Sequence, residues 1–146
     1  RWIGGMDAIK IDEIIKYQFY MIPKQLFTDE SYRKLSLDAK VIYALFIDRL
    51  ELSRKNNWIN EKGEVYLIFK RNDVAAILNL TEKTVSGAIK ELKNVNLVNE
   101  IRQGLGKPNL IYIGKLKMGV QEDSKLDFLN GKIYSSGEVK NTEQER

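Results

Sequence analysis

The residues best suited to chemistry lie on one face of a segment that the sequence predicts to be a helix, residues 81–94. Lysine ammonium groups and small hydroxyls there can donate hydrogen bonds to phosphate oxygens and to base edges. The members of this face are Lys83, Ser86, Gly87, Lys90 and Asn94. A helix enters the major groove of B-DNA only if its outward face is polar and not bulky, so this face predicts contact with duplex DNA.

Gly87 lies in the middle of this face. In a helix interior, glycine costs roughly 1 kcal/mol relative to alanine. The missing side chain would let the helix backbone approach DNA closely. The alternative is that Gly87 is merely tolerated on a solvated surface, and the sequence leaves both interpretations open.

The elements that must position this face can also be predicted. Thr81 can cap the first turn of the helix with its side-chain oxygen. The opposite side of the helix has apolar residues at i, i+3, i+4 and i+7, which form one buried stripe: Val85, Ala88, Ile89 and Leu92. A shorter helix is predicted before it, beginning near Asn72 and Asp73 and broken at Asn79.

Two strand-like runs follow, residues 97–101 and 110–113, and the glycine-containing segment 102–109 turns the chain between them. A positioning helix, a recognition helix and a hairpin in this order are typical of a winged helix-turn-helix. Residues 64–70 are predicted to form a strand that pairs with the hairpin. The predicted fold class is α+β, mainly α: a winged helix-turn-helix with an N-terminal arm and a long central helix.

Charge favours a polyanionic partner for this segment. The chain has a net charge of +4 at pH 7, whereas residues 70–117 hold nine cationic and four anionic side chains, a net charge of +5. In the hairpin, or wing, Arg102 and Lys107 can reach the DNA backbone or the minor groove, and the alternative is a solvated hairpin tip. The predicted DNA-binding residues are Arg71, Thr81, Lys83, Thr84, Ser86, Gly87, Lys90, Lys93, Arg102, Gln103, Lys107 and Asn109.

Two apolar segments predict self-association. The long helix, Ser36 to about Asn56, has apolar residues nearly all round its axis, more than one small domain is expected to cover. The aromatic segment 17–27 is predicted to be an extended strand running into a turn, because Pro23 forbids a regular helix. It could form ordinary core or an arm for a second protomer. The predicted dimer interface is Phe19, Tyr20, Met21, Phe27, Tyr43, Phe46 and Ile47.

The composition excludes several classes of site. The chain has no cysteine and no histidine, which rules out Cys/His zinc sites, disulfides, thiol nucleophiles and Ser-His-Asp triads. Its acidic residues show no paired-carboxylate spacing, so we expect no enzymatic activity, no metal and no cofactor. The longest apolar run, Val41 to Ile47, is too short to cross a bilayer, so we expect no membrane contact and a cytoplasmic location.

Three regions are predicted along the chain. Residues 1–5 are expected to be an artificial addition ahead of a natural start at Met6. Residues 6–117 form the winged-helix DNA-binding domain. Residues 118–146, rich in charged and small polar side chains, are expected to be a linker toward a C-terminal domain that this sequence does not include.

Two stretches carry motifs of a known family. The first is Phe19-Tyr-Met-Ile-Pro-Lys-Gln-Leu-Phe27, and the second, residues 35–69, contains Asp-Arg-x-x-Leu-Ser and Trp-Ile-x-x-x-Gly-x-Val-Tyr. Together they resemble the N-terminal domain of RepA-type plasmid replication initiators, the RepA_N family, over about residues 17–117. The contact residues given above rest on geometry, because the recognition helix and wing vary within that family.

The resemblance implies a function. Such proteins initiate plasmid replication in low-GC Gram-positive bacteria by binding double-stranded origin repeats, or iterons. Their separate C-terminal domain is expected to engage host replication proteins. The alternatives are a winged-helix transcription regulator and a winged helix that binds protein.

Overall fold

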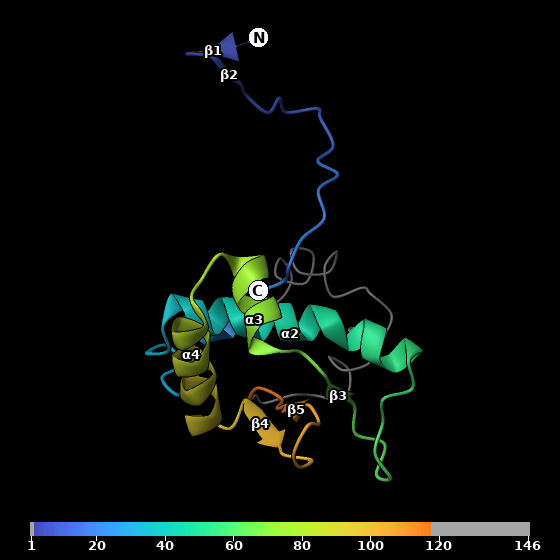
Figure 1. Cartoon of the computed structure of the whole chain (residues 1–146). Helices are drawn as coiled ribbons and strands as arrows, with labels where there is room; N and C mark the ends of the chain where they lie inside the picture. The colour runs from blue at the N-terminus through green and yellow to red at the C-terminus, as the bar shows by residue number, and fades with distance from the viewer. Residues whose placement is uncertain (1, 118–146) are drawn as a thin grey trace, which may run out of the picture. The chain divides into compact units, whose positions relative to one another are not determined.

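The computed structural model describes residues 2–117, and its elements follow the order of a winged helix-turn-helix (Figure 1). The helices are α1 (Gln25–Thr28), α2 (Leu37–Lys55), α3 (Arg71–Leu78) and α4 (Glu82–Asn94). The strands are β1 (Trp2–Ile3), β2 (Met6–Asp7), β3 (Tyr66–Leu67), β4 (Val98–Ile101) and β5 (Leu110–Ile113). The predicted class, α+β and mainly α, is confirmed. Residues 118–146, predicted as a linker, lie outside the described part.

The helix-turn-helix is built as its sequence predicts. Asn79 ends α3 in the left-handed conformation, with φ 57°, which asparagine tolerates better than most residues. Thr81 then caps α4, and its Oγ1 accepts a hydrogen bond of 3.1 Å from the backbone N–H of Thr84. The predicted stripe of α4 is fully buried: Val85, Ala88, Ile89 and Leu92. α3 begins at Arg71, one residue before the predicted start.

The long helix α2 is tied directly to α4. Ser36 caps α2, because its Oγ accepts a hydrogen bond of 3.1 Å from the N–H of Ala39. The Glu91 carboxylate of α4 accepts two further bonds, 2.8 Å from Ser36 N–H and 2.9 Å from Ser36 Oγ. A carboxylate at a helix N-terminus also complements the helix dipole. The start of α2 therefore fixes the position of α4 on the core.

This chain itself covers most of the apolar surface of α2, because α4 and β3 both pack against it (Figure 1). Phe46 is fully buried, and Tyr43 is 3% exposed. The Tyr43 hydroxyl donates a bond of 2.8 Å to the Gly114 carbonyl. Burial, with a contribution from Tyr32, raises the pKa of Tyr43 to about 12. The prediction that Tyr43 and Phe46 lie in a dimer interface is wrong, because both rings belong to the protein's own core.

The aromatic segment 17–27 does not form the predicted strand. Its first part has no regular secondary structure, and its end turns into the short helix α1. Pro23 stands ahead of that helix, where a missing N–H is tolerated, and its carbonyl accepts from the N–H of Leu26. Phe19, Tyr20 and Met21 are exposed. Phe27 is 44% exposed, with the Lys40 ammonium 4.3 Å from its ring centroid.

The hairpin joins a three-stranded antiparallel sheet in the order β3-β5-β4. The predicted pairing of the upstream strand with the hairpin is confirmed, although β3 is only two residues long. Beyond β5, the Gly114 N–H donates a bond of 2.8 Å to the Leu97 carbonyl. A Cβ at Gly114 would collide with the backbone carbonyl of Asn96, so only glycine allows this close approach.

Candidate nucleic-acid interface

The outward face of α4 is exposed and polar along its length, as the sequence predicts. Its residues are Lys83, Ser86, Gly87, Lys90 and Asn94, and all of them are exposed. Apart from the adjacent residues and the backbone of α4 itself, a Cβ added to Gly87 would have no described atom within 4 Å. Packing within the described protein therefore gives no reason for a glycine at this position. A helix backbone that meets an external surface closely would give one.

Arg71, at the start of α3, reaches across to this face. Its Nε–H donates a bond of 3.0 Å to Ser86 Oγ on α4. Its two terminal nitrogens donate to the two oxygens of Glu100 on β4, at 2.8 and 3.0 Å. The Lys93 ammonium, near the end of α4, bonds to the same carboxylate at 2.7 Å. This Glu100 cluster, as we call Arg71, Ser86, Lys93 and Glu100, joins both helices of the motif to the wing.

The electrostatics of the Glu100 cluster follow from burial and pairing. The Glu100 side chain is only 5% exposed. Its hydrogen bond with Arg71 is the largest cause that lowers its pKa to about 2, with Lys93 adding to the effect and burial opposing it. The same hydrogen bond raises the pKa of Arg71. The carboxylate is therefore ionised at neutral pH, and it balances two cations that the sequence assigned to DNA.

This arrangement divides the predicted contact residues into two groups. Arg71 and Lys93 have partners inside the protein, with side chains 29% and 42% exposed. Thr81 and Thr84 also bond to each other, 3.0 Å apart between their hydroxyl oxygens. The Lys83 and Lys90 side chains form no hydrogen bond or ion pair with another residue of the described range 2–117, and both are exposed on the outward face. No local sequence pattern indicated the Glu100 cluster, because Glu100 lies 29 residues from Arg71 along the chain.

The wing loop, residues 102–109, presents two exposed cations, Arg102 and Lys107. Its turn uses two glycines with positive φ, 121° at Gly104 and 77° at Gly106. The Gln103 side chain donates a bond of 2.7 Å to the Pro108 carbonyl, so it closes the loop. Gln103 therefore has a structural role in the loop, and its contact with DNA remains a prediction.

Leu105 was not among the predicted site residues. It stands between the two wing glycines and is 99% exposed. An apolar side chain held outward at the tip of a cationic hairpin can contact sugars or the floor of a groove. The glycines on both sides were the one signal in the sequence that could have identified it.

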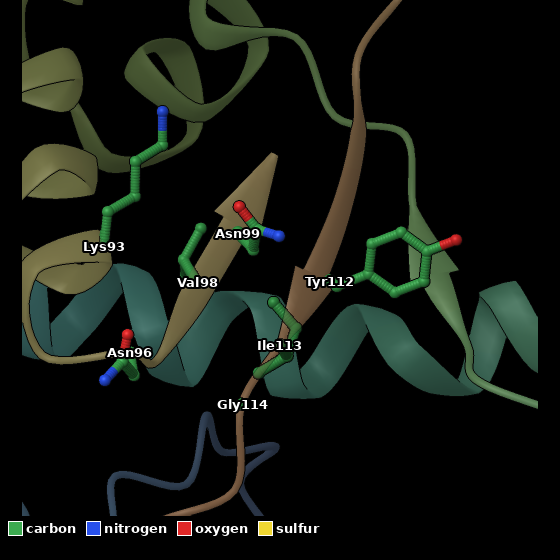
Figure 2. Close-up of a pocket in the computed structure, with 7 residues that line it drawn as sticks. All are labelled: Lys93, Asn96, Val98, Asn99, Tyr112, Ile113 and Gly114. Atoms are coloured by element: carbon green, nitrogen blue, oxygen red, sulfur yellow. The ribbon is translucent and has the colours of Figure 1, made fainter. Parts of the chain in front are cut away.

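A shallow hollow lies between the end of α4 and the sheet (Figure 2). It is lined by Lys93, Asn96, Val98, Asn99, Tyr112, Ile113 and Gly114. Lys93 extends away from Asn96 and Gly114, and its ammonium is bonded to Glu100. With that ammonium paired, the hollow offers the side-chain amides of Asn96 and Asn99, and we assign it no phosphate-binding role.

Two further properties concern the described residues alone. No group of three or more acidic, histidine or cysteine side chains is placed to hold a metal ion within residues 2–117. In the same range, none of the helices combines the length and the apolar character that crossing a membrane requires.

Three solved structures are similar to this chain in both fold and sequence. A structure described as "Structure of MDR initiator" is 37% identical, covers 85% of this chain and 98% of its own, and has a TM-score of 0.64. One described as "N-Terminal domain of DNA binding protein" is 36% identical, with coverages of 83% and 92% and a TM-score of 0.67. A third, "Structure of Rep-DNA complex", is 36% identical, with coverages of 83% and 93% and a TM-score of 0.66.

One curated protein and one family model also match this sequence. A "41 kDa protein" of Lactobacillus helveticus is 30% identical over 91 residues, which are 62% of this chain and 26% of that protein. The chain thus spans about a quarter of this relative's length. The family model described as "Replication initiator protein A (RepA) N-terminus" matches residues 18–126. Since that match covers most of the chain, this protein belongs to the RepA_N family.

Proposed function

We propose that this chain is the DNA-binding domain of a plasmid replication initiator, and that it binds double-stranded origin repeats. Family membership and its likeness to the Rep–DNA complex support this role. The observation that carries it is the outward face of α4, exposed, polar and open at Gly87. In the major groove, Lys83 and Lys90 would meet phosphates or guanine edges. The proposed role is binding, and we propose no catalysed reaction.

Selection from a pool of random-sequence duplexes tests this proposal. The protein should enrich one defined sequence, and electrophoretic shifts should show tighter binding to it than to an unrelated duplex. Lys83→Ala should weaken that binding by about 1–3 kcal/mol if Lys83 contacts a base. A protein that enriches no sequence and shifts no duplex would instead be a winged helix that binds protein.

A transcription regulator with the same module is the second candidate, and it would also enrich one sequence. The family match favours an initiator. The enriched sequence separates the two roles: an initiator's site should recur as repeats in a replication origin, whereas a regulator's site should stand singly at promoters. We propose that, in the whole protein, further domains engage host replication proteins.

The wing is expected to contribute through phosphate contacts. Replacing both Arg102 and Lys107 with alanine should make the slope of log affinity against log salt concentration shallower by about 1 for each lost contact. The measurement is a binding titration at several salt concentrations. The control is Arg54→Ala/Lys55→Ala at the end of α2, which removes the same charge and should keep the slope. If the wing variant kept its full slope, the wing would not touch DNA.

We also propose that two copies of the chain associate through the N-terminal arm, by which we mean residues 9–22, ahead of α1. Its large apolar side chains are all exposed in the single chain: Ile9, Ile11, Ile14, Ile15, Tyr17, Phe19, Tyr20, Met21 and Ile22. Exposed apolar patches of this extent typically mark an interaction site. A dimer would present two copies of α4 to two half-sites, about one helical turn of DNA apart. The predicted interface residues Phe27 and Ile47 could extend this surface.

Sedimentation at micromolar protein measures this association. The unmodified chain should sediment as a dimer, alone or with DNA, and Phe19→Ser/Tyr20→Ser should sediment as a monomer because the arm loses apolar area. Leu52→Ser, an exposed leucine of α2, should leave the dimer unchanged. A monomer under all conditions for the unmodified chain would refute the proposed dimer.

A further inference from the structure

The Glu100 cluster holds Arg71 in a fixed orientation. A guanidinium is planar, and its N–H groups form a rigid fork that matches a carboxylate. Here both terminal nitrogens of Arg71 donate to Glu100, at 2.8 and 3.0 Å. Lys93 holds the same carboxylate from the other helix, at 2.7 Å. With the fork fixed, the Nε–H of Arg71 has one direction in which to donate.

That direction leads to the hydroxyl of Ser86. The distance from Arg71 Nε to Ser86 Oγ is 3.0 Å, and arginine can only donate. A serine hydroxyl has two acceptor lone pairs and one hydrogen. Arg71 occupies one of these lone pairs, and no described residue accepts the hydrogen of Ser86, so that hydrogen is free to bond an acceptor. Ser86 lies on the exposed face of α4, where that acceptor can come from outside the protein.

We propose that Arg71, fixed by Glu100, is a positioning residue that makes Ser86 a hydrogen-bond donor to a base edge in the major groove. The acceptors there are N7 and O6 of guanine, N7 of adenine and O4 of thymine, whereas cytosine presents only a donor. Ser86 would therefore favour an acceptor-bearing base at one position of the site. This inference rests on the proposed function, because it requires α4 to lie in the major groove.

The base that the protein prefers at each position of its DNA site tests the inference. Selections from a random duplex pool are compared for the unmodified chain, Ser86→Ala, Arg71→Lys and the double variant. Both single variants should lose preference at the same base pair by about three- to tenfold, the size of one neutral hydrogen bond. The double variant should lose no more than Ser86→Ala, because the two residues act as one unit. If Arg71 served stability alone, Arg71→Lys would weaken binding without a specific loss of base preference at that base pair.

A base analogue provides a second measurement that does not depend on how Arg71→Lys folds. If the preferred base is guanine, 7-deazaguanine removes its N7 acceptor. The unmodified chain should then lose about three- to tenfold in affinity, and Ser86→Ala should lose nothing more. If guanine O6 is the acceptor, 6-thioguanine, which still pairs with cytosine but has a weaker sulfur acceptor, replaces 7-deazaguanine in the same comparison. Ser31→Ala is the matched control, since it removes the hydroxyl of an exposed serine ahead of α2 and should lose as much affinity with the analogue as the unmodified chain does.

The outcomes separate this inference from the proposed function. If the unmodified chain enriches no sequence, the proposed function fails. If it enriches a sequence but Ser86→Ala weakens binding equally at every position, Ser86 contacts phosphate and the inference is overturned. It is also overturned if a folded Arg71→Lys variant keeps the preference that Ser86→Ala loses.

Discussion

Replacing Gly87 with glutamate is expected to weaken binding to the selected duplex by at least about a hundredfold while the fold is retained. The position is on the outward face of α4, and an added Cβ would meet no described atom within 4 Å. The protein therefore has room for the side chain. The major groove of a bound duplex would not have room for it. The added side chain would hold the helix backbone away from the DNA, and its carboxylate would face the phosphates.

Alanine at the same position separates stability from binding. Gly87→Ala should raise the free energy of unfolding by about 1 kcal/mol, since alanine is the better helix former. It should nevertheless lower DNA affinity, because the methyl group stands in the interface. Thermal melts and binding titrations measure the two effects. Ser31→Glu, an exposed position ahead of α2, is the control for added charge. If Gly87→Glu kept its affinity within twofold, this face would not meet DNA.

Glu100→Gln is expected to lower the free energy of unfolding by about 3 kcal/mol at pH 7, because loss of the carboxylate leaves Arg71 and Lys93 without their anionic partner. The pKa of Glu100 is lowered to about 2 in the folded protein from an ordinary value of 4.5. A group with a lowered folded pKa stabilises the protein above its unfolded pKa. That stabilisation is lost as the pH falls from about 4.5 through about 2.

Urea unfolding at several pH values measures this effect. The difference between the unmodified chain and Glu100→Gln should be constant near neutral pH and should shrink steadily below pH 4.5. The matched control is Glu51→Gln, which removes a glutamate whose side chain is 68% exposed and pairs with Arg54 at 3.2 Å. Such surface pairs contribute about 0–1 kcal/mol. Equal losses for the two variants would mean that the Glu100 cluster does not stabilise the fold.

Local patterns in the sequence were sufficient to predict the helix-turn-helix and the wing. The stripe at i, i+3, i+4 and i+7 predicted α4 and its buried side, and Asn79 and Thr81 predicted the turn between the helices. These features depend on residues a few positions apart. The outward face of α4 follows from the same periodicity, which is why its exposure was also predictable.

Long-range partners were not predictable in the same way. The apolar pattern of α2 indicates burial, yet it does not say whether α4 and β3 or a second protomer provides the cover, so Tyr43 and Phe46 were assigned to the wrong surface. Likewise, the charge of Arg71 predicted a DNA contact, whereas the fold brings Glu100 to it from β4. Pro23 ruled out a helix through the aromatic segment, but α1 begins just after it.

Amide chemical shifts of the ¹⁵N-labelled chain, followed while the selected duplex is added, test most directly whether α4 reads DNA. The proposed interface predicts the largest changes at Lys83, Ser86, Gly87 and Lys90 and in the wing loop, residues 102–109. Signals from the exposed side of α2, such as those of Asp48 and Glu51, should stay in place. Saturable changes confined to α2 or to the hollow beside Asn96, with α4 unaffected, would contradict the account.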